Sequence, residues 1–416
     1  MMMLEQKQVR ITILSISILL GVGRVADCQA MPTLFTITGS SANEALGSFV
    51  SGAGDVNGDN YDDILTVSHL LSAPTPGIIR VRSGLDGSIL VSITGPPPNF
   101  GLPTVALGDV NGDGYADLAA HWTTPGTCPI LGRVAVPFVS TYSGASGAML
   151  YTIAGGCSQT LGTYMLRLDD ANGDGASDLA VSDLGFPGTP NVLATGQLTL
   201  YSGADGTILS SIVGNGVGDY FGSCTPLGDL DGDDRRDLLV RGFLPLRSEI
   251  RSGLNLAFIG FGPQVPYDRS SNAGDVDGDG VDDFLLAHQN SPASQGSLPG
   301  GQVNLYSGVS GLLLLTWTGT PGIPGVFGGD QLGSGLAGNV DVNNDGLLDV
   351  IIGASQRGNL PGEVRVYSAQ TGQLMFVTAG SCTNEFFGRY MDSAGDVNAD
   401  GFSDCVVGGP SCVNGV

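Results

Sequence analysis

Basic residues are scarce in this chain of 416 residues, and lysine occurs only once, at Lys7. Sixteen Lys and Arg residues stand against 40 Asp and Glu residues, so the formal net charge is −24. A nucleic-acid-binding protein needs a basic face for the phosphates, and anionic membrane surfaces attract clusters of basic residues. We therefore expect neither nucleic acid nor a membrane surface as a partner.

Long apolar runs are also rare, and the one that stands out covers residues 11–23. Lys7 and Arg10 precede this run and the small Ala30 follows it, an arrangement typical of an export signal. The run is shorter than the stretch of about 20 residues that a membrane-spanning helix needs, so we expect no membrane insertion. The sequence predicts a signal peptide over residues 1–30, cleavage after Ala30, and a mature protein secreted to the extracellular space or the periplasm.

Helical periodicity is missing from the rest of the chain. No apolar pattern with a period of 3.6 residues persists after the signal, whereas short apolar runs alternate with turns rich in the 67 glycines. The hydrophobic fraction of 42% is sufficient for a large core. The sequence therefore predicts an all-β protein.

One acidic motif of nine residues recurs seven times, 46 to 66 residues apart, which is the signature of a repeat architecture. We call these stretches the acidic loops. They begin at Asp55 (DVNGDNYDD), Asp109 (DVNGDGYAD), Asp170 (DANGDGASD), Asp229 (DLDGDDRRD), Asp275 (DVDGDGVDD), Asp341 (DVNNDGLLD) and Asp396 (DVNADGFSD).

Each acidic loop lies in a similar frame of strand-like segments. A short apolar run such as 64–67 (ILTV) follows the loop, and a hairpin signal such as 142–147 (YSGASG) comes after a variable segment. Four strands in each unit predict a seven-bladed β-propeller of four-stranded blades over residues 31–416. The predicted blades cover about residues 40–95, 96–155, 156–214, 215–261, 262–319, 320–380 and 381–416, the last together with 33–39.

The predicted ring has a seam, because seven acidic loops are accompanied by only six hairpin signals. Residues 33–39 (TLFTITG) match an outer strand such as 89–95 (ILVSITG). We therefore expect the N-terminal segment to form the outer strand of the last blade and to close the ring. Strand 3 of that blade has no counterpart in the sequence, which leaves open whether the chain is a truncated product.

The acidic loops carry the oxygen donors that Ca²⁺ prefers. Positions 1, 5 and 9 are always Asp, position 3 is Asp or Asn, and position 7 varies as expected if only its carbonyl coordinates. Position 6 is Gly, or Asn60 or Asp234, residues that tolerate positive φ. A plain Asn-Gly hairpin turn is the alternative, but it does not explain acids at fixed positions in seven copies.

We therefore expect up to seven structural Ca²⁺ ions. The predicted ligands, taken from positions 1, 3, 5, 7 and 9, are Asp55, Asn57, Asp59, Tyr61, Asp63, Asp109, Asn111, Asp113, Tyr115, Asp117, Asp170, Asn172, Asp174, Ala176, Asp178, Asp229, Asp231, Asp233, Arg235, Asp237, Asp275, Asp277, Asp279, Val281, Asp283, Asp341, Asn343, Asp345, Leu347, Asp349, Asp396, Asn398, Asp400, Phe402 and Asp404.

A Phe-Gly pair such as Phe100–Gly101, an acidic loop and a YSGxxG hairpin together resemble the FG-GAP repeat. This repeat builds the propellers of integrin α-subunits and occurs in many secreted bacterial proteins, and the resemblance covers residues 33–416. It implies Ca²⁺ sites on one face of a propeller and ligand contacts on the opposite face. The chain departs from the repeat at 266–274, which lacks Phe-Gly, and through an insertion between Gly328 and Asp341.

The rim opposite the acidic loops holds the candidate ligand-binding residues. A three-histidine metal centre is one interpretation of the only histidines, but they come from blades that are not all neighbours, so we interpret them as rim residues. Aromatic and Arg residues on exposed loops suit protein or glycan recognition, although they are equally common as ordinary loop residues. The candidates are His69, His121, Trp122, Asp183, Arg241 and His288.

Four cysteines occupy loops on this same rim, two of them before a first strand and two after a second strand. In an exported protein, such positions predict two disulfide bridges. The predicted pairs are Cys128–Cys157 and Cys382–Cys412. Cys224 and Cys405 lie within strand-like runs, and we interpret them as buried thiols.

The sequence favours a binding module over an enzyme. It contains no Ser–His–Asp spacing, phosphate-binding loop or CxxC motif, and its clustered carboxylates are committed to the acidic loops. We expect a monomeric, non-enzymatic module for protein binding or cell adhesion, with an extracellular protein or glycan as ligand. The alternative is a carbohydrate-binding protein or a non-catalytic accessory protein of a polysaccharide-degrading system.

Overall fold

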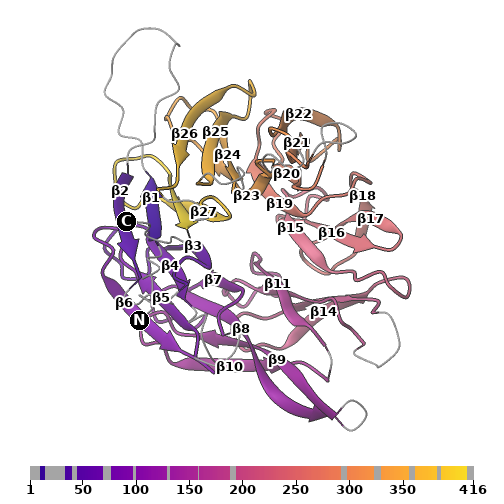
Figure 1. The fold of residues 1–416 in the computed structure, drawn as a ribbon. Helices are drawn as coiled ribbons and strands as arrows, with labels where there is room; N and C mark the ends of the chain where they lie inside the picture. The colour runs from indigo at the N-terminus through magenta and orange to yellow at the C-terminus, as the bar shows by residue number, and fades with distance from the viewer. Residues whose placement is uncertain are drawn as a thin grey trace, which may run out of the picture.

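The computed structural model consists of β-strands joined by turns and loops (Figure 1). It describes residues 10–14, 33–39, 45–68, 76–96, 100–128, 132–157, 159–187, 194–291, 298–322, 329–355, 361–381 and 386–409, with side chains undescribed at 10–14, 127–128 and 132–134. None of these residues is helical, which confirms the all-β prediction. Within the same ranges, no helix is long and apolar enough to cross a membrane.

Six four-stranded antiparallel sheets are each built from consecutive strands, which confirms the predicted blades of four strands. Their strands are β3 (Phe49–Gly54), β4 (Asp63–Ser68), β5 (Ile78–Arg82) and β6 (Ile89–Thr94); β7 (Thr104–Gly108), β8 (Asp117–Cys128), β9 (Gly132–Tyr142) and β10 (Met149–Ala154); β11 (Leu161–Arg167), β12 (Leu179–Asp183), β13 (Gln197–Tyr201) and β14 (Ile208–Val213); β15 (Ser223–Pro226), β16 (Leu238–Phe243), β17 (Leu246–Arg251) and β18 (Phe258–Phe261); β19 (Arg269–Gly274), β20 (Asp283–His288), β21 (Gln302–Tyr306) and β22 (Leu313–Thr318); β23 (Leu332–Val340), β24 (Asp349–Ala354), β25 (Glu363–Ser368) and β26 (Leu374–Ala379).

The sheet at the seam takes two strands from each end of the chain. Its order is β2 (Thr33–Thr38), β1 (Arg10–Leu14), β28 (Asp404–Gly409) and β27 (Tyr390–Gly395). The prediction of an outer strand from the N-terminal segment is confirmed, but the prediction that strand 3 is missing is wrong, because β1 lies between β28 and β2. Six blades, not seven, are thus made of consecutive strands, and the last sheet includes residues that the sequence assigns to an export signal.

The sheets stand around a common centre (Figure 1). The first strands β3, β7, β11, β15, β19, β23 and β27 line this centre, and neighbouring first strands contact one another around the ring. At the seam, the Ser51 hydroxyl on β3 donates to Asp392 Oδ2 on β27 at 2.6 Å. Each acidic loop follows a first strand, so all seven loops lie at the same end of the inner ring.

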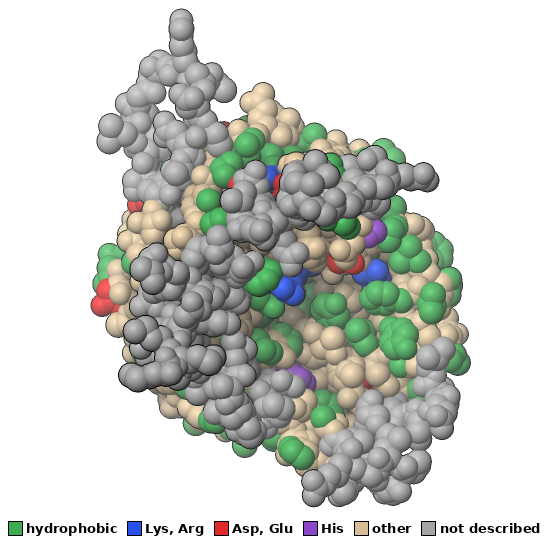
Figure 2. Space-filling view, in the orientation of Figure 1, with side chains coloured by type: hydrophobic (Ala, Val, Ile, Leu, Met, Phe, Trp, Pro, Cys, Tyr) green, Lys and Arg blue, Asp and Glu red, His purple; other side chains and the backbone are tan. Residues whose placement is uncertain are grey.

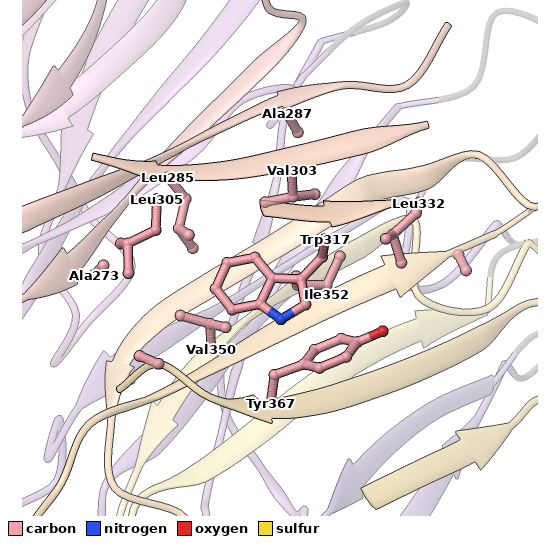
Figure 3. Packing of buried hydrophobic residues seen from close by; sticks show 12 residues of the cluster. Ala273, Leu285, Ala287, Val303, Leu305, Trp317, Leu332, Val350, Ile352 and Tyr367 are labelled. Carbon is pink, nitrogen blue, oxygen red and sulfur yellow. The ribbon is translucent and has the colours of Figure 1, made fainter. Parts of the chain in front are cut away.

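The hydrophobic core lies between neighbouring sheets. Figure 3 shows one such layer, in which Leu285 and Val303 of one blade face Val350 and Ile352 of the next. The second strands β4, β12, β24 and β28 are buried at every residue, because a neighbouring sheet covers each of their faces. A strand buried on both faces needs apolar residues on both, which explains the continuous apolar runs after the acidic loops.

Candidate functional site

The acidic loops occupy equivalent places in all seven sheets. Each joins the first strand to the second, as residues 55–62 join β3 to β4. Position 9 either begins the second strand, as Asp63 does in β4, or directly precedes it, as Asp178 does before β12. The repeat in the sequence thus places seven similar sets of oxygen donors on one face of the ring.

Within each loop, carboxylates accept hydrogen bonds from the loop's own backbone. The Oδ1 atom of Asp109 accepts from the Gly112 amide at 2.7 Å, and its Oδ2 atom accepts from the Gly114 amide at 2.8 Å. Asp113 Oδ1 accepts from the Tyr115 amide at 3.0 Å. These bonds curl the backbone around the side chains at positions 1 and 5.

Position 6 of the loop requires a left-handed backbone. Gly114 has a φ of +89°, and in the two loops without glycine Asn60 and Asp234 have φ values of +68° and +63°. Asn and Asp accept this region more readily than other residues with a Cβ atom. The prediction of positive φ at position 6 is therefore confirmed at both substituted copies.

Two loops bring three carboxylates together. Oxygen atoms of Asp229, Asp231 and Asp237 all lie within 4.8 Å of one another, and so do those of the matching residues in the fifth loop, Asp275, Asp277 and Asp283. Because like charges at such distances repel, the ionised clusters need a positive charge nearby. This donor set suits a hard divalent cation such as Ca²⁺, which takes six to eight oxygen ligands.

The aspartate at position 9 is buried in all seven loops. Burial raises the pKa of Asp404 to about 8 and that of Asp349 to about 7, against an ordinary value of 3.8. In both cases the acids at positions 1 and 5 raise the pKa further. A cation among the ligands would hold these carboxyl groups in their ionised form, so their environment fits a metal site.

Position 9 also joins the acidic loop to the outer hairpin of its blade. In the first five loops one carboxylate oxygen accepts from the backbone amide of the hairpin's first glycine, as Asp283 Oδ1 does from Gly308 at 2.9 Å. The sixth hairpin has Ala369 in place of that glycine, and Asp349 Oδ1 has no hydrogen-bond partner in the described part of the chain. Sequence reasoning treated the glycine only as a turn residue and missed this contact.

We expect Gly308→Ala to lower the free energy of unfolding by about 1–3 kcal/mol, because a buried acceptor loses its donor. A Cβ atom at Gly308 would lie 2.2 Å from the carbonyl oxygen of Asp282, so the hairpin must move away from the loop. Gly260→Ala is the matched control, since its Cβ atom would meet nothing within 4 Å. Urea denaturation of both variants measures the difference, and equal losses would contradict the role assigned to Gly308.

The histidines do not come together as a metal centre among the described residues. His69 lies outside those residues. The Nδ1–H group of His121 donates to the Leu102 carbonyl at 2.8 Å, and burial lowers the pKa of this histidine. His288 ends β20, three sheets away along the chain. His121 thus stabilises its own blade through this hydrogen bond.

The other rim candidates are also engaged within the protein. The indole of Trp122 stacks on Phe138 and donates to the Ser140 hydroxyl at 2.9 Å. Asp183 and Arg241 are 3% and 7% exposed, against the expectation that they lie on exposed loops. Asp183 accepts two backbone amides, and the Arg241 guanidinium lies between aromatic rings and donates to a backbone carbonyl.

A cavity of about 380 Å³ opens at the end of the ring opposite the acidic loops. We call it the axial cavity, because residues of the first strands β3, β11, β15, β19, β23 and β27, or directly before them, line it. Its polar lining includes Tyr164, Tyr267, Asp268, Arg269, Arg389 and Tyr390. In Figure 2, basic side chains lie near the centre of the face shown.

Sequence reasoning missed these residues, because they share no motif. The one available signal was their position shortly before an acidic loop, within or directly before a first strand. Arg269 in addition lies in the stretch 266–274, where the repeat loses its Phe-Gly pair.

Of the cysteines, Cys224 and Cys405 are free thiols; Cys405 is buried, as predicted, whereas Cys224 is only partly buried and lines the axial cavity. Burial raises the pKa of both to about 12, so neither is reactive as a thiolate. Cys382, Cys412 and the side chain of Cys128 lie outside the described part of the structure, and the two predicted bridges stay predictions.

Comparison with known proteins agrees with the fold and the loops. The family model "FG-GAP repeat" matches residues 102–120, which contain the second acidic loop. The chain is 26% identical to mouse integrin alpha-2 over 233 residues, which is 53% of this chain and 16% of that protein. It is 34% identical to human integrin alpha-6 over 95 residues, 20% of this chain and 8% of that protein.

The fold is that of a β-propeller of four-stranded blades, and the matched segment carries the FG-GAP repeat. Both matches confirm the predicted resemblance to the FG-GAP repeat and to integrin α-subunits. The matched regions span less than a fifth of the length of these integrins. A crystal structure of the rhamnogalacturonan lyase YesW aligns with 80% of this chain and 57% of its own at 16% identity, but its TM-score of 0.43 carries no inference about activity.

Proposed function

We propose that the protein is an extracellular, calcium-stabilised β-propeller that binds a protein ligand in cell adhesion and catalyses no reaction. The ligand binds at the face opposite the acidic loops. The observation that carries this proposal is the contrast between the two ends of the inner ring. One end is crowded with clustered carboxylates, and the other opens into the axial cavity with arginine and tyrosine side chains.

Calcium has a structural role in this proposal. The carboxylates and amides at positions 1, 3, 5 and 9 of the acidic loops hold up to seven Ca²⁺ ions, with the carbonyl of position 7. These positions contain 23 of the 40 acidic residues. The ions would neutralise like charges that otherwise repel, and so fix each hairpin between first and second strand.

The proposal extends to the whole mature chain. Residues 31–416 form one propeller that acts as a monomer and is exported by an N-terminal signal. Bridges Cys128–Cys157 and Cys382–Cys412 would reinforce the rim opposite the acidic loops in an oxidising environment.

A carbohydrate ligand, with a role as a non-catalytic accessory protein in polysaccharide degradation, is the second candidate. The presence of three tyrosines in the axial cavity favours it, because aromatic rings pack against sugars as well as against side chains. Binding to neutral oligosaccharides on a glycan array, in the absence of cell attachment, would replace the adhesion proposal with this one.

Cell attachment to surfaces coated with the protein tests the proposal. We expect Tyr164→Ala, in the axial cavity, to reduce attachment severalfold, because Tyr164 is 38% exposed at the proposed ligand face. Leu85→Ala is the control: Leu85 is 57% exposed and lies in an outer hairpin beside the first acidic loop. Attachment that is absent from the wild-type surface, or that falls equally in both variants, would overturn the proposal.

A further inference from the structure

The axial cavity combines two arginines with a single carboxylate. Asp268, Arg269 and Arg389 all line it. Asp268 already accepts a hydrogen bond from the backbone amide of Gln289 at 3.0 Å. The cavity therefore holds more positive than negative charge, in a protein whose net charge is −24.

These two arginines differ from two enclosed arginines elsewhere in the protein, which form ion pairs. Arg247 lies 2.8 Å from Asp219, and Arg365 lies 2.7 Å from Asp330. Neither Arg269 nor Arg389 forms an ion pair with any residue that the structure describes. Guanidinium groups left without a carboxylate beside a cavity are suited to recruit one from a ligand.

Arg269 has a buried hydrogen-bond donor without an acceptor among the described residues. Its Nε atom is buried and makes no hydrogen bond among the described residues. A buried donor without an acceptor costs about 1–3 kcal/mol, which a ligand oxygen at that place would relieve. Burial lowers the pKa of Arg269; Tyr390 raises it, and the like charge of Arg389 lowers it, so an anion between the two arginines would remove a repulsion.

The tyrosines that line the axial cavity suit a ligand that places a small polar group beside an apolar or aromatic contact. The side chains of Tyr164 and Tyr390 stand in the cavity with hydroxyl groups that bond to no other described residue. The Arg389 guanidinium lies 5.8 Å from the ring centre of Tyr390. A volume of about 380 Å³ is at the small end of ligand sites, enough for one side chain and its neighbours.

We infer that the axial cavity binds the carboxylate side chain of an acidic residue in the protein ligand, held between Arg269 and Arg389. This inference rests on the proposed function and names the chemistry of its ligand. The charge of the whole protein favours a peptide with one acidic residue among neutral ones. A polyanionic glycan would be repelled by the net charge of −24 before it reached the two arginines.

Titration calorimetry with two blocked pentapeptides, Ser-Gly-Glu-Gly-Ser and Ser-Gly-Gln-Gly-Ser, tests the inference. We expect the Glu peptide to bind at least about tenfold more tightly, because only its carboxylate makes charge-assisted hydrogen bonds. Arg389→Gln and Arg269→Gln should each weaken binding of the Glu peptide about tenfold. Arg389 is exposed, so its variant is expected to fold even where Arg269→Gln does not.

Arg236→Gln is the control at the opposite end of the ring. Arg236 is exposed and forms a 3.7 Å ion pair with Asp169, so its loss should leave peptide binding unchanged. Equal binding of the two peptides, no binding of either, or tighter binding of trigalacturonate than of the Glu peptide would overturn the inference. If cell attachment still depends on Tyr164 while the Glu peptide does not bind, the inference fails and the proposed function stands.

Discussion

The protein is expected to melt about 10 °C higher in calcium than in a chelator. Each acidic loop would contribute about 1.4 kcal/mol of linkage free energy when free calcium is about tenfold above its Kd. Seven loops would contribute about 10 kcal/mol, and unfolding entropy of about 2.1 cal/mol/K per residue converts this into the stated shift. Differential scanning calorimetry measures it directly.

Two controls make this measurement specific. Magnesium should give a smaller shift, because it demands octahedral geometry and retains its water. Asp283→Asn should remove about one seventh of the calcium shift, whereas Asp277→Asn should remove less, because position 3 is Asn in five of the loops. A melting temperature that does not respond to calcium would show that the acidic loops are only turns.

The direction of the pH dependence should reverse when calcium is removed. Without metal, burial raises the pKa values of Asp404, Asp349 and Asp63 to about 8, 7 and 6 in the folded protein, against 3.8 when unfolded. The folded state then binds more protons than the unfolded state between about pH 4 and pH 8, so stability rises as the pH falls. With calcium, protons compete with the metal for the same carboxylates, and stability falls with the pH.

The seven acidic loops and their blades were predictable because the residues that define each of them are close together in the sequence. Each loop carries its ligands within nine residues, and the apolar run after it, such as 64–67, reflects a second strand covered on both faces. The axial cavity was not predictable in this way. Arg269 and Arg389 come from blades 120 residues apart along the chain, and only closure of the ring brings them to one cavity.

The hydrogen bond from position 9 to the outer hairpin was predictable only in part. The hairpin glycine was visible in the sequence, but the sequence does not show why glycine is required there. The structure shows that two backbones approach closely across the blade at this position. A Cβ atom at Gly144 would lie 1.8 Å from the carbonyl oxygen of Ala116, a contact between residues far apart along the chain. The substitution at Ala369 then explains the unpaired oxygen of Asp349.

Removal of residues 1–30 is expected to lower the melting temperature and to expose the edge of β28. Residues Arg10–Leu14 pair with Cys405–Gly409 on one side and with β2 on the other, and β2 pairs with no other strand of the described residues. Cleavage after Ala30 would therefore leave β28 with one open edge and β2 unpaired. An open edge of a buried strand is a template for pairing with another chain, so the association state of the shortened chain tests the monomer proposed for residues 31–416.

Three preparations separate the contribution of β1 from that of the rest of the N-terminus: the full chain, residues 31–416, and residues 31–416 with a peptide of residues 9–15 added in solution. Hydrogen exchange at the amides of β28 should be slow in the full chain, fast in the shortened chain, and slowed again by the peptide, because only a strand between β28 and β2 covers that edge. Analytical ultracentrifugation should show a monomer in all three preparations, and dimerisation of the shortened chain would contradict the monomeric state proposed for residues 31–416. A shortened chain with unchanged melting temperature and unchanged exchange at β28 would show that β1 contributes nothing to the closed ring.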